Sequence, residues 1–205
     1  MLYKPIIYFF FLFLTGGILH SQEQALVTIA TRFSQKEIEK LEKGRILIGI
    51  EELADNNVLV KAYLLFDNMP ETCWRILSNT DLEKEYMKVI VESHRFPVSS
   101  EKDRVEYLIQ WLFFRKKFRL IHYYDHKAYI MQWHLDPFYV NDLDTHRGYW
   151  QLYSYPGNRT LAEYAGNMAV KGLPRWFENL VKSEVIRLTM IDIKHYMDKS
   201  LSKSR

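Results

Sequence analysis

The sequence predicts an α+β fold in which one antiparallel sheet is covered by a long C-terminal helix. Three observations lead to this fold: a long amphipathic segment near the C-terminus, a series of strand-like segments joined by tight turns, and two short helical segments after the first strands. The length of 205 residues and the hydrophobic content of 48% suit one domain with one core. Aromatic residues make up 15% of the chain, which favours many strands or a large apolar interior.

The long C-terminal helix is expected from Leu173 to about Lys199. Pro174 suits the first turn of a helix, where its missing N–H is not needed, and no Gly or Pro interrupts the residues that follow. Such a helix requires a broad apolar partner, because apolar residues recur along it at helical spacing. The recurring positions are Leu173, Phe177, Leu180, Leu188 and Ile191, and the stripe is broadened by Trp176, Val181, Val185 and Met190.

The first part of the chain predicts a helix, two strands and two more short helices. Ser34 and Glu37 have capping-box spacing at the start of a helix that ends at Gly44. Residues 45–51 and 58–66 resemble two strands around a turn at 55–57. Pro70 marks the first turn of one short helix, and residues 81–86 form a second.

The middle of the chain predicts a meander of strands. The turns or interruptions fall at 97–100, 115–117, 125–127, 137–147 and 156–158. Successive strands joined this tightly pair antiparallel, because no helix lies between them to build a parallel crossover. The expected strands are Lys88–Phe96, Val105–Phe114, Phe118–His126, Ala128–Leu135, Gly148–Tyr155 and Arg159–Val170.

The N-terminus has the pattern of a cleavable secretory signal peptide. Lys4 supplies the positive charge, Ile6–Leu14 is an apolar block too short to span a bilayer, and Ser21 is the expected last residue of the leader. An uncleaved N-terminal anchor is the alternative. The expected organisation is a signal peptide at 1–21, a helical extension at 22–44, the main domain at 45–199 and a polar tail at 200–205. This organisation predicts a periplasmic or secreted protein.

Charge and residue content argue against several classes of function. The net charge of +3 falls to +2 without the leader, which contains one Lys and no acidic residue, so nucleic acid is not an expected partner. Cys73 is the single cysteine, so no intramolecular disulfide forms. The seven His show no metal-ligand spacing, and neither a nucleophile elbow nor a Gly-rich phosphate loop is present. We therefore expect no metal and no cofactor.

Three passages carry a resemblance to a known family: Ala62–Trp74, which joins a strand to the first short helix, the late hairpin Arg147–Tyr164, and Gly172-Leu173-Pro174 at the start of the last helix. In this order and spacing, over roughly Val58–Met197, the chain resembles the START-like helix-grip superfamily. This superfamily, also called SRPBCC, includes polyketide cyclase/dehydrase and coenzyme Q-binding relatives. The resemblance implies a strongly curved antiparallel sheet wrapped around the long helix, with a cavity between them for an apolar ligand.

Residues on the expected concave face are the candidates for this cavity. A stripe of aromatic residues is more often solid core, so close packing of most of these positions is the competing interpretation. The candidate cavity residues are Tyr107, Ile109, Trp111, Leu120, His122, Met131, Trp133, Leu152, Tyr164, Phe177, Leu180 and Leu188.

Candidate chemistry rests on the even spacing of His122, Tyr124 and His126, which places them on one side of a strand. An imidazole beside a phenol at a pocket mouth could act as a general acid and base. The competing interpretation places His126 in a hairpin turn and His122 on the surface of a strand.

Two functions follow. The first is an exported, non-catalytic START-like domain that binds a hydrophobic small molecule such as a lipid or a quinone. The alternative is a cyclase/dehydrase-type enzyme acting on a polyketide-like or aromatic substrate, with His122, Tyr124 or Tyr164 moving protons. A buried His–Tyr pair at the cavity would favour the enzyme, and a purely apolar cavity would favour the carrier. The basic segment Arg115–Lys117 with Arg119 is compatible with transient membrane contact, although a solvated turn is the commoner explanation of such a segment.

Overall fold

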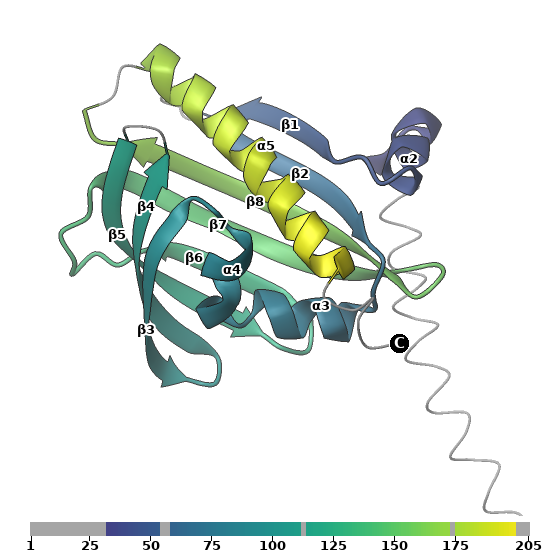
Figure 1. The fold of residues 1–205 in the computed structure, drawn as a ribbon, viewed down its shortest axis with the longest axis horizontal. Coiled ribbons are helices and arrows are strands. Elements are labelled where there is room, and N and C mark those ends of the chain that lie inside the picture. Colours follow the sequence, from purple (N-terminus) through teal and green to yellow (C-terminus); the bar gives the residue numbers. More distant parts are fainter. Residues whose placement is uncertain (1–31, 54–57, 112–113, 173–174, 200–205) are drawn as a thin grey trace, which may run out of the picture.

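The computed structural model describes residues 32–53, 58–111, 114–172 and 175–199, with the backbone alone described at 52 and over 175–183. The predicted signal peptide, the turn at 55–57 and the polar tail lie outside these residues. The elements, in chain order (Figure 1), are α2 (Gln35–Glu42), β1 (Leu47–Glu52), β2 (Val58–Phe66), α3 (Pro70–Leu77), the 3-10 turn η2 (Thr80–Leu82), α4 (Glu83–Tyr86), β3 (Ile90–Ser99), β4 (Lys102–Trp111), β5 (Phe114–Asp125), β6 (Ile130–Leu135), β7 (Leu143–Tyr155), β8 (Arg159–Val170) and α5 (Arg175–Lys199).

The described strands form one eight-stranded sheet in the order β1-β2-β8-β7-β6-β5-β4-β3, with every neighbouring pair antiparallel. The sheet is strongly curved, and α5 crosses its concave face while α3 and α4 lie near one end (Figure 1). The predicted α+β helix-grip fold, with two short helices after the first strands, is confirmed.

Local sequence signals set several element boundaries. Ser34 and Glu37 form the predicted capping box of α2, and Pro70 occupies the first turn of α3. The β7–β8 hairpin turns at Gly157 and Asn158, with φ of 79° and 57°. The loop has three residues, Pro156-Gly157-Asn158, because Tyr155 pairs with Arg159, and a residue with positive φ is typical of such a loop.

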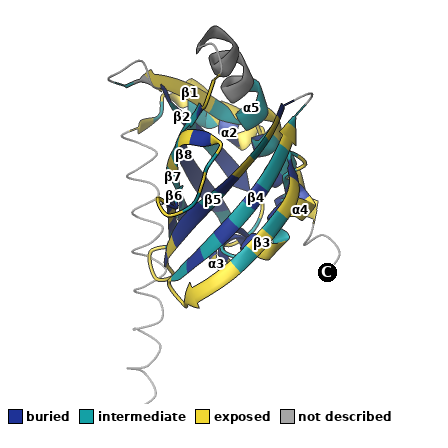
Figure 2. Ribbon diagram, turned by 90° about the vertical axis from the view of Figure 1, so that its left-hand side faces the viewer, coloured by how far each residue is buried: buried dark blue, intermediate teal, exposed yellow. Residues whose placement is uncertain are grey.

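Several strand boundaries differ from the prediction, including both ends of β4, which runs over Lys102–Trp111 and not over Val105–Phe114. Strand β3 continues through Pro97, because it is the last strand in the sheet order and an edge strand tolerates a residue without an N–H. Its mostly exposed outer edge is yellow in Figure 2. Residues 115–117 lie inside β5, and β7 begins at Leu143, within the predicted 137–147 loop.

The main core lies between the concave face and α5, and the buried side of α5 also differs from the prediction. Met190, Ile193 and Met197 are buried, whereas Leu188 and Ile191 are 37% and 42% exposed. Met190 belongs to the broad apolar stripe that the sequence predicts, whereas Leu188 and Ile191 of the same stripe do not face the core.

A second, smaller core joins α2 to the convex face. Leu41 packs with Leu65, Tyr155 and Leu161 there. Strand residues alternate between faces, so Leu65 points away from the main core that Leu64 and its neighbours enter. The predicted N-terminal extension is thus packed on the sheet from α2 onward. Among the described helices, none has the length and apolar character needed to cross a membrane.

Candidate functional site

A cavity of about 140 Å³ lies between the concave face of the sheet and α5. Its wall comes from β2 to β8, from α4 with the residues that follow it, and from α5. Most of the lining side chains are apolar, so the cavity is a water-poor environment in which the few polar groups are energetically important.

Seven of the twelve candidate cavity residues line this space, and their contact with a ligand stays a prediction. Leu152 is buried in the core without lining the cavity, and Trp111 is half-buried at the end of β4. Leu188 faces away because it lies two residues from Met190, on another side of the helix. For Phe177 and Leu180 the structure describes the backbone alone, so the prediction for these two side chains lies outside the described part of the chain. The seven lining residues are Tyr107, Ile109, Leu120, His122, Met131, Trp133 and Tyr164.

His122 is the first polar group of the cavity wall. It is only 2% exposed, so the interpretation of His122 as a surface residue is wrong. Its Nδ1 lies 3.1 Å from Oδ1 of Asp103, its cross-strand partner on β4. With Nδ1 engaged, Nε2 is the ring nitrogen left for a molecule in the cavity. His126, by contrast, lies in the β5–β6 turn, as the competing interpretation expected.

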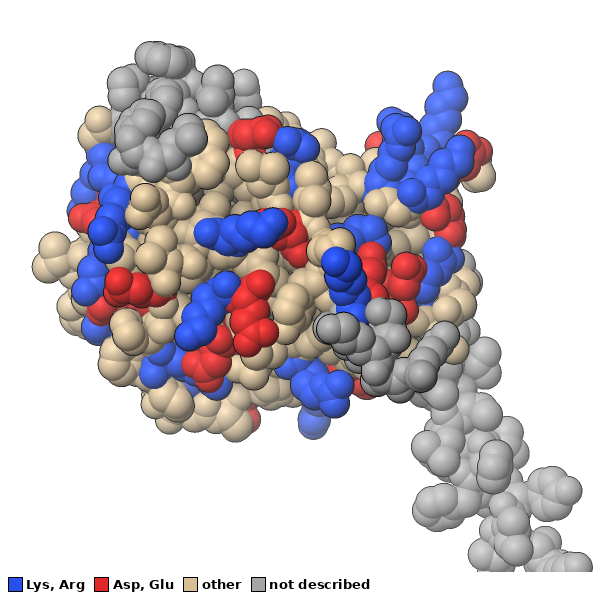
Figure 3. Space-filling view, viewed as in Figure 1, with Lys and Arg blue, Asp and Glu red and all other residues tan. Residues whose placement is uncertain are grey.

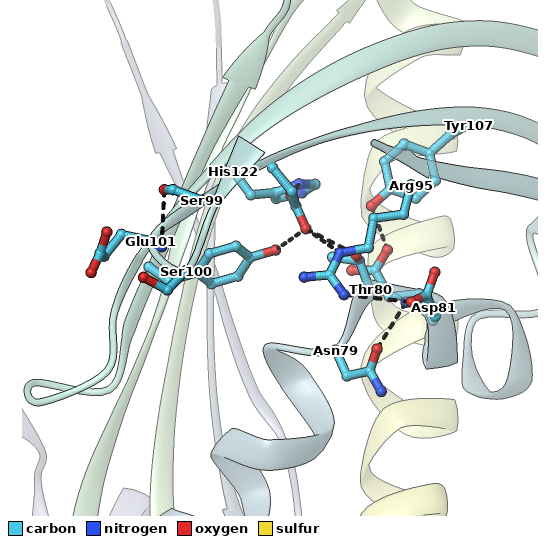
Figure 4. Close-up of polar contacts among 12 residues, drawn as sticks. Asn79, Thr80, Asp81, Arg95, Ser99, Ser100, Glu101, Tyr107 and His122 are labelled. Carbon is cyan, nitrogen blue, oxygen red and sulfur yellow. Dashed lines mark hydrogen bonds and ion pairs between the residues drawn. The ribbon is translucent and has the colours of Figure 1, made fainter. Parts of the chain in front are cut away.

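Asp103 is fully buried and accepts hydrogen bonds from several elements. Its Oδ2 accepts from Arg95 Nε at 2.7 Å, from the Tyr124 hydroxyl at 2.9 Å and from Thr80 Oγ1 at 3.3 Å. Figure 4 shows Arg95, Thr80 and His122 converging on this point. Burial alone would raise the pKa of Asp103, but the bonds from His122, Arg95 and Tyr124 outweigh it and lower the pKa.

Glu83 is a second buried carboxyl at the cavity wall, only 4% exposed. The Tyr107 hydroxyl donates to its Oε2 at 2.5 Å. Burial raises the pKa of Glu83 to about 7, against the lowering effect of His122 and of the Tyr107 hydrogen bond. Near neutral pH this carboxyl is therefore able to gain or lose a proton.

His146 completes the polar part of the wall. Burial lowers its pKa to about 4, and the nearby His122 contributes to the same effect. Trp133 Nε1 donates to Nδ1 of His146 at 3.4 Å, which fits a neutral imidazole. Burial also raises the pKa of Tyr164, so this phenol stays protonated.

Sequence reasoning found His122 and Tyr164 but missed Asp103, Glu83 and His146. The signal for Asp103 was available, because it shares the strand parity of the inward-facing Val105 and Tyr107. Glu83 gave no such signal, since a Glu in a short helix is usually solvated. Among the described residues, no group of three or more His, Cys, Asp or Glu is placed to hold a metal ion.

The arrangement can do two things chemically. Nε2 of His122 and the Glu83 carboxyl can hydrogen-bond a polar group on an otherwise apolar molecule. The same two groups can also exchange a proton with it, because an imidazole oriented by a carboxylate and a carboxyl with a pKa near neutrality are general acid–base groups.

Comparison with known proteins finds no matching family model and no matching curated protein. Solved structures do match. A STAR-related lipid transfer protein fragment from Xanthomonas axonopodis is 10% identical, with a TM-score of 0.62 over 74% of this chain and 93% of that one. Human STARD10 is 12% identical, with a TM-score of 0.60 over 77% of this chain and 72% of that one.

The Zhui aromatase/cyclase from Streptomyces sp. R1128 is 7% identical, with a TM-score of 0.57 over 69% of this chain and 96% of that one. At such low identity these likenesses concern the fold and not the ligand. They agree with the strand order, the two short helices and the long closing helix described above. The chain therefore has the START-like helix-grip fold.

Proposed function

We propose that this domain binds a hydrophobic small molecule, such as a lipid or a quinone, in the cavity between the sheet and α5. The observation that carries the proposal is the largely apolar cavity with His122 and Glu83 in its wall. Apolar burial supplies affinity in such a site, and a few polar groups fix orientation. The lipid-transfer protein among the structural neighbours supports this class of ligand.

The volume of the cavity limits what fits inside it. A cavity of about 150 Å³ holds a benzene-sized molecule, whereas pockets for drug-sized ligands measure about 300–1,000 Å³. The 140 Å³ of this cavity therefore suits a ring or a short stretch of chain. A longer ligand would extend beyond the cavity or move α5 outward.

The polar part of the wall defines the end of the ligand. A hydroxyl or carbonyl group beside His122 Nε2 and Glu83 would satisfy buried polar atoms that otherwise lose hydrogen bonds. A ligand with no polar atom would make no hydrogen bond with Nε2 of His122 or with Glu83. We therefore favour a molecule with an apolar body and one uncharged polar end.

A cyclase/dehydrase-type enzyme is the second candidate, and the Asp103–His122 pair favours it. Asp103 holds Nδ1 of His122, so Nε2 is oriented to move a proton on a polyketide-like or aromatic substrate. The ring centre of His122 lies 6.2 Å from that of Tyr107, and Tyr164 lines the same cavity, which supports this candidate. The aromatase/cyclase among the structural neighbours supports the same reaction class.

The proposal also includes the place of action. The N-terminal leader supports export to the periplasm or beyond, with an uncleaved anchor as the alternative. A carrier in either place would meet a membrane transiently to collect or deliver an apolar molecule.

Binding in the cavity can be tested with a matched pair of variants on α5. Thr189 lines the cavity, whereas the adjacent Leu188 is exposed. We expect Thr189→Phe to bind the apolar probe N-phenylnaphthylamine about tenfold more weakly than the wild type, and Leu188→Phe to bind it normally. Equal binding by both variants, with unchanged thermal melting, would refute a ligand site in this cavity.

Carriage and catalysis differ in what happens to the bound molecule. Native mass spectrometry of protein purified from its own envelope would identify a co-purifying compound. Carriage predicts that this compound is recovered unchanged after incubation with fresh protein. Conversion by the wild type, but not by His122→Asn, would instead establish the enzyme.

A further inference from the structure

The connection between β6 and β7, residues 136–142, presents two apolar side chains to solvent. Phe138 is 92% exposed and Val140 is 91% exposed, while the other large exposed hydrophobic residues of the described chain lie between 36% and 58%. This β6–β7 loop projects at the left edge of the molecule in Figure 1. Exposed apolar side chains that lie close together are a feature of interaction sites, whereas scattered single ones are normal.

Hydrogen bonds hold the β6–β7 loop in place. Asp136 is buried, its backbone N–H donates to the Arg119 carbonyl at 2.8 Å, and its Oδ1 accepts from the Phe138 N–H at 3.0 Å. The Asn141 side chain donates to the Asp136 carbonyl at 2.9 Å and accepts from the Arg119 N–H at 2.8 Å. The loop is therefore ordered in advance, so exposure of its tip does not result from lack of structure.

Exposure is not uniform along the loop, because Tyr139, between Phe138 and Val140, is packed against the protein. The Arg119 guanidinium lies 4.2 Å from the centre of the Tyr139 ring and 5.2 Å from that of Phe96. Tyr139 thus packs on the sheet while the residues on either side of it, Phe138 and Val140, point outward. A loop that only closed a hairpin would not require apolar residues at the outward positions.

The ion pairs around the loop are asymmetric. Asp136 is 3% exposed and its partner Arg104 is 40% exposed, while Glu106 is 12% exposed and its partner Lys117 is 53% exposed. In each pair the carboxylate is far less exposed to solvent than the basic side chain. Lys171, which is also exposed, donates to the Asn141 carbonyl at 2.9 Å. The solvent side of the loop base is therefore rich in cationic groups, although Asp142 is exposed as well.

Charge alone does not mark a docking surface on this protein. Blue and red side chains are interspersed over the face drawn in Figure 3. The basic segment Arg115–Lys117 with Arg119, for which lipid contact was one interpretation, is partly compensated, because Lys117 and Arg119 share the single carboxylate of Glu106. The outward apolar pair is what distinguishes the β6–β7 loop.

We propose that the β6–β7 loop docks on a lipid bilayer by inserting Phe138 and Val140 among the lipids while Lys117 and Lys171 contact anionic phosphate groups. Two side chains are too few for a stable protein interface, which usually buries more than about 1,000 Å². Shallow insertion of a few apolar side chains next to cations is sufficient for weak, reversible binding to an anionic membrane surface.

Vesicle flotation with the full chain tests the proposal. The vesicles contain phosphatidylcholine alone or phosphatidylcholine mixed with phosphatidylglycerol in a three-to-one ratio. We expect binding to the mixed vesicles, reduced about tenfold in Phe138→Ala and further in the Phe138→Ala/Val140→Ala double variant. Ile50→Ala is the matched control, because Ile50 is 58% exposed on β1.

Site-specific labelling gives a second measurement. Cys73 is buried, so an environment-sensitive fluorophore on Phe138→Cys reports on the loop alone. We expect its emission to shift to the blue with mixed vesicles, whereas a label on Ile50→Cys stays unchanged. Equal flotation of the double variant and the wild type would refute the proposal, as would a label that responds to lipid-free protein extract but not to vesicles. Flotation independent of phosphatidylglycerol would overturn the role of the lysines.

The proposal is separate from ligand binding in the cavity. Phe138 and Val140 do not line the cavity. The double variant should therefore keep normal N-phenylnaphthylamine binding while it loses vesicle binding. Loss of probe binding together with vesicle binding would indicate a disturbed fold.

Discussion

Asp103 and His122 are cross-strand partners on β4 and β5, and their side chains meet at 3.1 Å on the inner face of the sheet. A register shift of one residue in either strand would turn that strand's side chain to the outer face and separate the pair. The pair therefore depends on the β4–β5 register, and the cavity chemistry depends on the pair.

Replacing Asp103 should destabilise the fold as well as the site. Asp103→Asn would turn an amide N–H₂ toward groups that already donate, and would remove the charge that pairs with Arg95. We expect a loss of roughly 2–4 kcal/mol in the free energy of unfolding, measured by urea denaturation. Asp81→Asn is the control, since Asp81 also contacts Arg95 but is 63% exposed, and it should cost less than about 0.5 kcal/mol.

Glu83 should make stability fall as pH rises toward neutrality. Its folded-state pKa of about 7 lies above the usual value of 4.5, so the unfolded chain ionises first. The stability present below pH 4.5 is then lost progressively up to about pH 7, by an amount on the order of 3 kcal/mol. Urea denaturation of the wild type and of Glu83→Gln should diverge across this window.

The two buried carboxyls Glu83 and Asp103 change the stability with pH in opposite directions. The pKa of Asp103 is lowered, so its contribution is present above its usual pKa of 3.8 and is lost as the pH falls further. Glu85→Gln, a neighbouring exposed position, is the control and should follow the wild type. If the free energies of unfolding of the wild type and of Glu83→Gln change with pH in parallel, Glu83 ionises normally.

Local patterns were enough to predict the fold because the relevant signals are short in range. Alternation identified the inward-facing Val105 and Tyr107, and turn residues located the hairpin at Gly157 and Asn158. The start of β7 was missed because strand residues 144–147 are polar and resemble a loop in isolation. Their pairing with β8 decides their conformation, and pairing is a tertiary property.

The candidate site was predicted in its apolar part and only partly in its polar part. Alternation places a side chain on a face of the sheet, so it found His122 and could have found Asp103. Alternation along a strand gives no information about which elements cover a short helix such as α4. Glu83 is buried because α4 packs near β4, where Tyr107 donates to its carboxylate, and no local pattern encodes that contact.

Gly148 should be required for the wall of the cavity. A Cβ at this position would come within 2.4 Å of the Ala165 carbonyl oxygen and 2.5 Å of Trp133, which lines the cavity. Backbone cannot move aside cheaply, so Gly148→Ala should destabilise the protein by about 1–3 kcal/mol and weaken binding of the apolar probe. Gly49→Ala is the control because a Cβ there meets nothing within 4 Å. Normal stability of Gly148→Ala would mean that β7 and β8 are less closely packed than described.

The buried stripe of α5 gives a direct test of how this helix sits on the sheet. Met190 is 2% exposed and contributes to both the main core and the cavity wall, whereas Leu188 is 37% exposed. Met190→Ala should therefore cost about 2–4 kcal/mol in the free energy of unfolding, while Leu188→Ala should cost less than about 1 kcal/mol. The stripe expected from the sequence, with Leu188 facing the sheet, predicts a large cost for Leu188→Ala instead. Denaturation of the two variants thus distinguishes two rotations of α5, and only the one that buries Met190 closes the cavity described above.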